Sequence, residues 1–159
     1  MPQRVAMRSL ETKVPPPIVA LLMAALMWVA SLKVPSADVP LAIRVTVAVV
    51  VALAGLAVGV AAIVSFRRAR TTVNPLKPNT ASSLVTGCIF RFTRNAMYVS
   101  MLVYLLAWAV YLSSWLALVC LPIFVFYIDR FQIGPEERAL EALFGQEYAT
   151  YKERVRRWL

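Results

Sequence analysis

Apolar residues are gathered into three long stretches, and the lengths of these stretches predict how the chain folds. They cover residues 14–32, 45–66 and 95–128, and none of them contains a charged residue. A helix needs about 20 mostly apolar residues to cross a hydrocarbon core of roughly 30 Å. The sequence therefore predicts an all-α integral membrane protein.

The third stretch, residues 95–128, is too long to be a single span. As one helix it would extend about 51 Å at roughly 1.5 Å per residue. The apolar run is interrupted at Ser113-Ser114, and Trp108 and Trp115 lie close by, as in an aromatic belt at a membrane interface. We therefore expect a tight helical hairpin that turns at these serines, and four transmembrane helices in all.

The positions of the basic residues support four spans and orient them. Of the 17 lysines and arginines, all but Lys33 and Arg44 lie before residue 14, between residues 67 and 97, or after residue 128. Short cytoplasmic loops collect such residues. We expect both termini to be cytoplasmic, and the location to be the inner membrane of a bacterium.

Two further helices are predicted after the last span. Gly134-Pro135 is expected to break the chain, and Glu136 and Glu137 then favour a helix start, where carboxylates face the positive end of the dipole. Gly145 is expected to end this helix. A second short helix carries apolar and aromatic residues at helical spacing: Tyr148, Tyr151, Val155 and Trp158. Basic residues lie between them, which is typical of an amphipathic helix on a membrane surface.

The composition is typical of a membrane protein, and it indicates which kinds of partner the chain binds. The chain is 60% hydrophobic and 16% charged, with a formal net charge of +9. Basic residues beside apolar spans suit anionic headgroups, and nothing resembles a nucleic-acid-binding module. We expect membrane lipids and no nucleic acid as partners, while no pattern indicates an oligomeric state. The chain has no histidine, the commonest metal ligand and general base, so no metal site is expected.

Polar residues suited to chemistry lie in two blocks outside the spans. The first block, residues 84–98, contains Leu-Val-Thr-Gly and then Arg-Phe-Thr-Arg-Asn-Ala-Met-Tyr. The second block, residues 135–151, contains Pro-Glu-Glu-Arg-Ala-Leu and then Phe-Gly-Gln-Glu-Tyr-Ala-Thr-Tyr. In sequence and in their order around the hairpin, the blocks resemble those of the isoprenylcysteine carboxyl methyltransferase and phospholipid methyltransferase superfamily. The resemblance covers roughly residues 71–159.

Three positions depart from the pattern of that superfamily. Asn95 stands where histidine is usual, Ala96 where proline is usual, and Ser100 where glycine is often found. Ala96 relaxes the backbone restriction that a proline imposes on the residue before it. Ser100 argues against a very close backbone approach at that point.

The resemblance implies that S-adenosylmethionine is the cofactor, held at the cytoplasmic end of the bundle by both blocks. The cofactor-binding residues expected from it are Gly87, Arg94, Asn95, Met97, Tyr98, Glu136, Glu137, Leu140, Tyr148 and Tyr151. Glu136 or Glu137 would accept hydrogen bonds from the ribose, and Arg94 would bind the methionine carboxylate. Arg91 and Arg138 are the candidate catalytic residues, as cations that would orient a carboxylate acceptor.

On this interpretation the chain is one methyltransferase domain over residues 1–159. A polar tail covers residues 1–13, two N-terminal spans lie within residues 14–66, and residues 67–159 form the catalytic core. The core comprises a cytoplasmic loop, the hairpin and the C-terminal helices.

Several functions remain open at this point. A lipophilic substrate entering from the bilayer is expected, either a carboxylate of the isoprenylcysteine type or the amine of a phospholipid or small molecule. The absence of histidine disfavours the amine, which must lose a proton. A four-helix transporter or channel subunit is an alternative, although no ionisable residue interrupts the spans as ion routes require. A sterol-reductase-like protein that uses NADPH is another.

Overall fold

All regular structure in the described part of the chain is helical. The computed structural model describes residues 14–35, 37–70 and 83–159, and no strand occurs in these ranges. The all-α prediction is therefore confirmed. The predicted polar tail, residues 1–13, and part of the predicted cytoplasmic loop lie outside the described residues.

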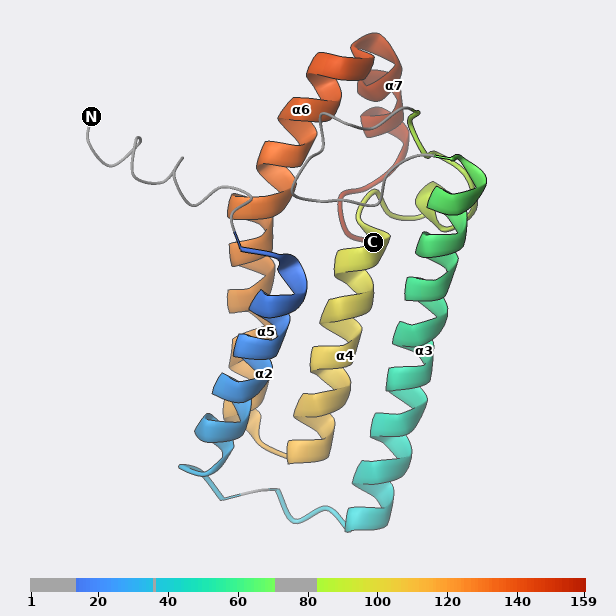
Figure 1. Ribbon diagram of the computed structural model, residues 1–159. Coiled ribbons are helices and arrows are strands. Elements are labelled where there is room, and N and C mark those ends of the chain that lie inside the picture. The colour runs from blue at the N-terminus through green and yellow to red at the C-terminus, as the bar shows by residue number, and fades with distance from the viewer. Residues whose placement is uncertain (1–13, 36, 71–82) are drawn as a thin grey trace, which may run out of the picture.

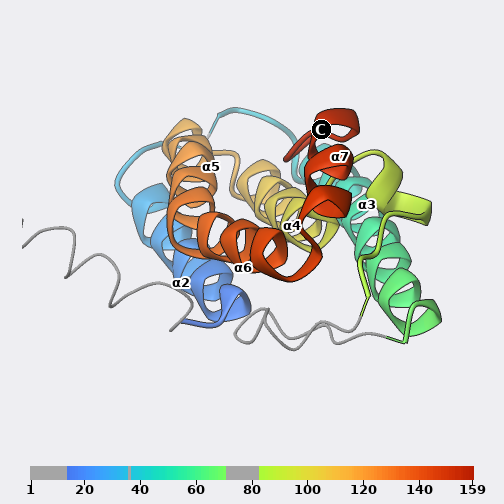
Figure 2. The same cartoon turned by 90° about the horizontal axis from the view of Figure 1, so that it is seen from above.

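Four apolar helices run side by side and form the body of the molecule (Figure 1). They are α2 (Pro16–Ser31), α3 (Leu41–Arg68), α4 (Ala96–Leu112) and α5 (Trp115–Ile128). Helix α4 packs against the other three, and α2 also packs against α5. Seen from above, α4 lies between α3 on one side and the α2–α5 pair on the other (Figure 2). The central helix is thus the one that begins in the first block.

The predicted hairpin turn at Ser113-Ser114 is confirmed. Ser113 ends α4 in the left-handed conformation (φ 50°), and Ser114 is extended just before α5 begins. The turn also holds the connection between α2 and α3, because the Ala37 N–H donates to the Ser113 carbonyl at 2.8 Å. Both connections therefore lie at the same end of the bundle (Figure 1).

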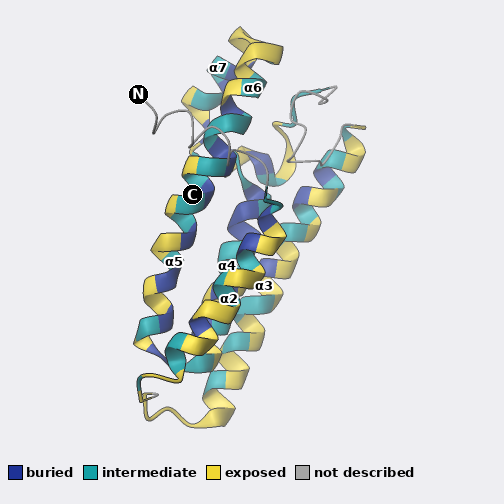
Figure 3. Ribbon diagram, turned by 60° about the vertical axis from the view of Figure 1, so that its left-hand side comes forward, coloured by how far each residue is buried: buried dark blue, intermediate teal, exposed yellow. Residues whose placement is uncertain are grey.

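Two helices are long and apolar enough to cross a membrane by length and composition. They are Leu41–Arg68 and the continuous helix Trp115–Phe144, while α2 and α4 are apolar but shorter. Only 17% of the most apolar part of the first and 33% of that of the second are buried, whereas a core helix of a soluble protein is mostly buried. Exposed residues run along the outer faces of the helices (Figure 3), and among the described residues they include Leu21, Leu22, Val50, Leu53 and Phe126. This apolar surface is suited to lipid.

The predicted break at Gly134-Pro135 is wrong, because the helix continues through it. Helix α5 passes into a π-helical turn, η3 (Asp129–Ile133), and then into α6 (Gly134–Phe144). A proline in a regular helix lacks a donor and clashes with the carbonyl four residues earlier. The wider π turn changes the hydrogen-bonding register just before Pro135 and accommodates the misfit. The predicted break at Gly145 (φ 49°) is confirmed, and α7 (Gln146–Arg154) follows it.

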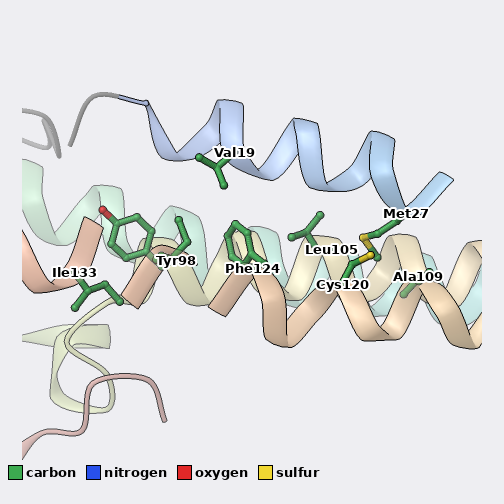
Figure 4. Packing of buried hydrophobic residues seen from close by; sticks show 10 residues of the cluster. Val19, Met27, Tyr98, Leu105, Ala109, Cys120, Phe124 and Ile133 are labelled. Carbon is green, nitrogen blue, oxygen red and sulfur yellow. The ribbon is translucent and has the colours of Figure 1, made fainter. Parts of the chain in front are cut away.

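The main core lies between α2, α4 and the α5–η3 helix. Its buried residues include Val19, Leu105, Phe124 and Ile133. In Figure 4, Val19 points toward Phe124, with Leu105 close by, and Ile133 lies at the other end of the cluster, beyond Tyr98. Tyr98 belongs to the same core and lies near its end, at the start of α4. The core therefore supports a site residue directly.

Helices α3 and α4 approach closely at two glycines, Gly55 and Gly59. The Ser100 hydroxyl donates to the Gly55 carbonyl at 2.8 Å. A Cβ built on Gly59 would lie only 2.8 Å from Ser100 Oγ. The expectation that Ser100 argues against close approach is thus wrong, since glycines on the partner helix make the room.

Candidate active site

The two blocks meet at the end of the bundle opposite the hairpin turn. Helices α6 and α7 lie above the start of α4, and the chain then folds back over it (Figures 1 and 2). In the first block, Gly87 is extended and leads into a short 3₁₀ helix, η2 (Cys88–Arg91). Asn95 then occupies the cap position of α4. Side chains from both blocks therefore converge at one place.

Tyr98 and Glu136 form the first contact between the blocks. The Tyr98 hydroxyl donates to Glu136 Oε1 at 2.5 Å. Glu136 lies in the polar helix α6, beyond the apolar α5. Burial raises the pKa of this carboxyl to about 7, although the Tyr98 hydrogen bond lowers it and the neighbouring Glu137 raises it further. This group therefore exchanges its proton near neutral pH.

Glu137 forms the second contact, with two arginines. Its Oε1 lies 3.2 Å from Arg94 Nη1 of the first block. Arg157 donates from Nε to Oε1 at 3.2 Å and from Nη2 to Oε2 at 2.5 Å. The Glu137 and Arg94 side chains are each only 10% exposed, so this is an ion pair removed from solvent. We refer to Arg94, Tyr98, Glu136 and Glu137 as the carboxylate cluster.

The C-terminal tail, residues 155–159, holds the start of α4 by its backbone. The Arg94 N–H donates to the Arg156 carbonyl at 3.0 Å. The Arg157 carbonyl accepts from Thr93 Oγ1 at 3.3 Å and from Asn95 Nδ2 at 2.9 Å. The amide of Asn95 is thus engaged in joining two segments of the chain.

An aromatic cluster packs beside the carboxylate cluster. Tyr148, Tyr151 and Val155 are buried together, with Leu140 against them. The Tyr151 hydroxyl donates to the Phe90 carbonyl of η2 at 2.7 Å. Burial, together with the negative charge of Glu137, raises the pKa of Tyr148 to about 12. The second block thereby contacts the first through apolar as well as polar groups.

This packing corrects the prediction of a membrane-surface helix. The tyrosines of α7 are buried against the protein, because the first block supplies an apolar partner for them. The helix ends at Arg154, so Trp158 does not share its face. Instead the Trp158 indole donates to Asp129 Oδ1 at 3.0 Å, and its ring packs against the main core.

The structure thus gathers most of the expected site residues but not all of them. Leu140, Tyr148 and Tyr151 lie beside the carboxylate cluster, and Asn95 is joined to it through the tail. Met97 is half-buried against a small core that contains Phe90. Gly87, Arg91 and Arg138 are exposed, so their predicted roles remain predictions.

Sequence reasoning missed the contribution of the tail. Arg157 makes two hydrogen bonds to Glu137 yet lies outside both motif blocks. Thr93 and Asp129 also fix the tail, and neither was selected. The sequence signal for this contact was a run of basic residues before Trp158, and such a run is equally typical of a membrane-facing surface.

The cluster retains polar groups that fit S-adenosylmethionine. Although Arg94 lies near Glu137, its Nε and Nη1 have no hydrogen-bond partner of good geometry among the described residues. Such buried donors suit a carboxylate, which the methionine part of the cofactor carries. Within the described chain, Glu137 Oε2 has one recorded donor, which leaves a lone pair for a hydroxyl. The residues present therefore fit the cofactor that the sequence implied.

Residues 43–147 match the sequence profile of the phospholipid methyltransferase family. A protein of Haemophilus influenzae (strain ATCC 51907 / DSM 11121 / KW20 / Rd), described as an uncharacterized protein, is 51% identical over 63 residues. The matched region is 40% of this chain and 100% of that protein. No solved structure matches.

Proposed function

Because this chain belongs to the phospholipid methyltransferase family, and is thus a membrane methyltransferase, we propose that it transfers a methyl group from S-adenosylmethionine to a lipophilic acceptor. The observation that carries the proposal is the carboxylate cluster. Two acidic residues of the second block contact an arginine and a tyrosine of the first, at one end of an apolar bundle.

The roles of the cluster follow from the charges on the cofactor. Arg94 offers buried donors to the methionine carboxylate, and Glu137 offers an acceptor to the ribose hydroxyls. Tyr148 and Tyr151 present ring surface beside them. The bound cofactor supplies a methyl group already activated by its sulfonium. The remaining task of the protein is to orient the acceptor and exclude water.

The acceptor is proposed to be an amine, with Glu136 as its proton acceptor. A protonated amine has no lone pair and must lose its proton before it can be methylated. Glu136 has a pKa of about 7, and among the described residues Tyr98 donates to its Oε1. Glu136 can therefore act as the general base, although the chain has no histidine. A carboxylate acceptor would need cations instead, and the candidates Arg91 and Arg138 lie at exposed positions.

We also propose that all four apolar helices span the membrane, with the carboxylate cluster on the cytoplasmic side. The turn between α4 and α5 and the α2–α3 connection share the opposite end. Most basic residues of the described ranges lie at the end with the carboxylate cluster, as the bias toward positive cytoplasmic loops predicts. A lipid acceptor would then enter sideways between the helices.

Binding of S-adenosylhomocysteine tests the cofactor assignment. In a calorimetric titration of the detergent-purified chain we expect saturable binding, which Glu137→Ala abolishes because the ribose loses its acceptor. Glu153→Ala is the matched control, since Glu153 is exposed on α7, and it should bind as the wild type does. Absence of binding by the wild type, together with thermal stabilisation by NADPH, would favour the reductase alternative.

A further inference from the structure

Arg157 joins the carboxylate cluster although neither motif block contains it. Its guanidinium contacts Glu137 through two nitrogens, Nε and Nη2, one on each carboxylate oxygen. Such a two-point contact fixes the carboxylate plane as well as its distance, which a single point charge does not do. Arg157 thus controls how Glu137 is presented.

The position of Arg157 is itself fixed from both sides. Its carbonyl is held by Thr93 and Asn95 at the start of α4. The following residue, Trp158, packs on the main core and donates to Asp129. Asp129 also lies 3.7 Å from Arg157 Nη1. The guanidinium is therefore held in place by the fold rather than by its pair with Glu137 alone.

Because Glu137 is buried, loss of its ion pair with Arg157 costs more than loss of an exposed ion pair would. Exposed ion pairs contribute little because water screens them, and Arg157 itself is 40% exposed. Glu137, however, is only 10% exposed, so its charge depends on partners in the protein. The hydrogen bond to Glu137 is the main cause that raises the pKa of Arg157, so this partner stays cationic. Without it, Arg94 alone would face the carboxylate.

We propose that Arg157 is a positioning residue for cofactor binding, which orients Glu137 so that Oε2 is presented to the cofactor ribose. The inference rests on the proposed function, because it needs a cofactor at the carboxylate cluster. It adds the C-terminal tail to the site as a third segment, beside the two blocks. Arg157 acts through Glu137 and does not itself touch the cofactor.

A double-mutant cycle in the full chain tests this role. Calorimetry with S-adenosylhomocysteine would compare the wild type, Arg157→Gln, Glu137→Gln and the double variant. We expect Arg157→Gln to weaken binding by about tenfold to a hundredfold, as for loss of a charged hydrogen bond. The double variant should bind no more weakly than Glu137→Gln alone. Arg157→Lys should recover part of the loss, because it restores the charge but not the two-point contact.

The control and the contrary results separate this inference from the proposed function. Arg154→Gln removes the same charge from an exposed position on α7 and should bind as the wild type does. If the wild type does not bind, the proposed function fails. If the wild type binds and Arg157→Gln binds equally well or more tightly, the inference fails. Additive losses in the double variant would also overturn it, since a purely structural role predicts additivity.

Discussion

At the level of single residues, burial and the opposing hydrogen bond from Tyr98 together determine the proton affinity of Glu136, the proposed base. Burial raises the pKa of the Glu136 carboxyl to about 7, and the tyrosine opposes this shift by stabilising the ionised form. An ionised Glu136 accepts a proton and a protonated one does not. The rate of methyl transfer should therefore rise as the pH increases through about 7.

Tyr98→Phe should move this rise in rate to higher pH. The variant keeps the ring but removes the donor that favours the carboxylate, so the pKa of Glu136 should increase. The measurement is the pH profile of kcat. Tyr104→Phe is the control, because Tyr104 is exposed on the same helix, and its profile should match the wild type. An unchanged profile in Tyr98→Phe would show that Glu136 is not the base.

The motif residues could be predicted from the sequence, but their partners could not. The resemblance of the two blocks to the methyltransferase superfamily identified Arg94, Tyr98, Glu136 and Glu137 as site residues. The contact of Arg157 with Glu137 depends on how the tail folds back across 20 positions of the chain. No local pattern encodes that path, because the tail is positioned by Thr93 and Asn95 in a distant segment.

At the scale of helices, the contact of α3 with α4 depends on the absence of a side chain at Gly59. Gly59→Leu should lower stability by about 1–3 kcal/mol, as overpacking typically does, because Ser100 Oγ occupies the space. Thermal unfolding in detergent would measure this loss. Val60→Leu is the control at the adjacent exposed position and should leave the unfolding temperature unchanged. Equal effects of the two variants would contradict the packing.

Helix boundaries were predictable where residues act locally and not where packing decides. Ser113 and Gly145 mark helix ends that the structure confirms. Pro135 signalled an end that does not occur, because a π turn accommodates it within a continuous helix. The π turn leads into the helix in which Glu136 contacts Tyr98. The continuous helix that the sequence did not predict is therefore the one that carries this site residue.

For the whole molecule, the proposed four-span arrangement predicts which ends are accessible from each side of the membrane. Cys88 is exposed near the carboxylate cluster, and Cys120 is buried. In spheroplasts, a membrane-impermeant maleimide should label Cys88 only after permeabilisation. A double variant, Asp38→Cys with Cys88→Ser, should be labelled without permeabilisation, because residue 38 lies exposed in the α2–α3 connection. Labelling of Cys88 in intact spheroplasts would refute this orientation.

We propose that this membrane methyltransferase transfers the methyl group of S-adenosylmethionine to a lipophilic amine, with Glu136 as the base. The most direct test incubates the purified chain with methyl-labelled cofactor and a bacterial lipid extract, followed by mass spectrometry. We predict label in an amine-bearing lipid with the wild type, and at least about a tenfold loss with Glu136→Gln. Failure of the cofactor-binding wild type to label any lipid, or equal labelling by Glu136→Gln, would contradict the claim.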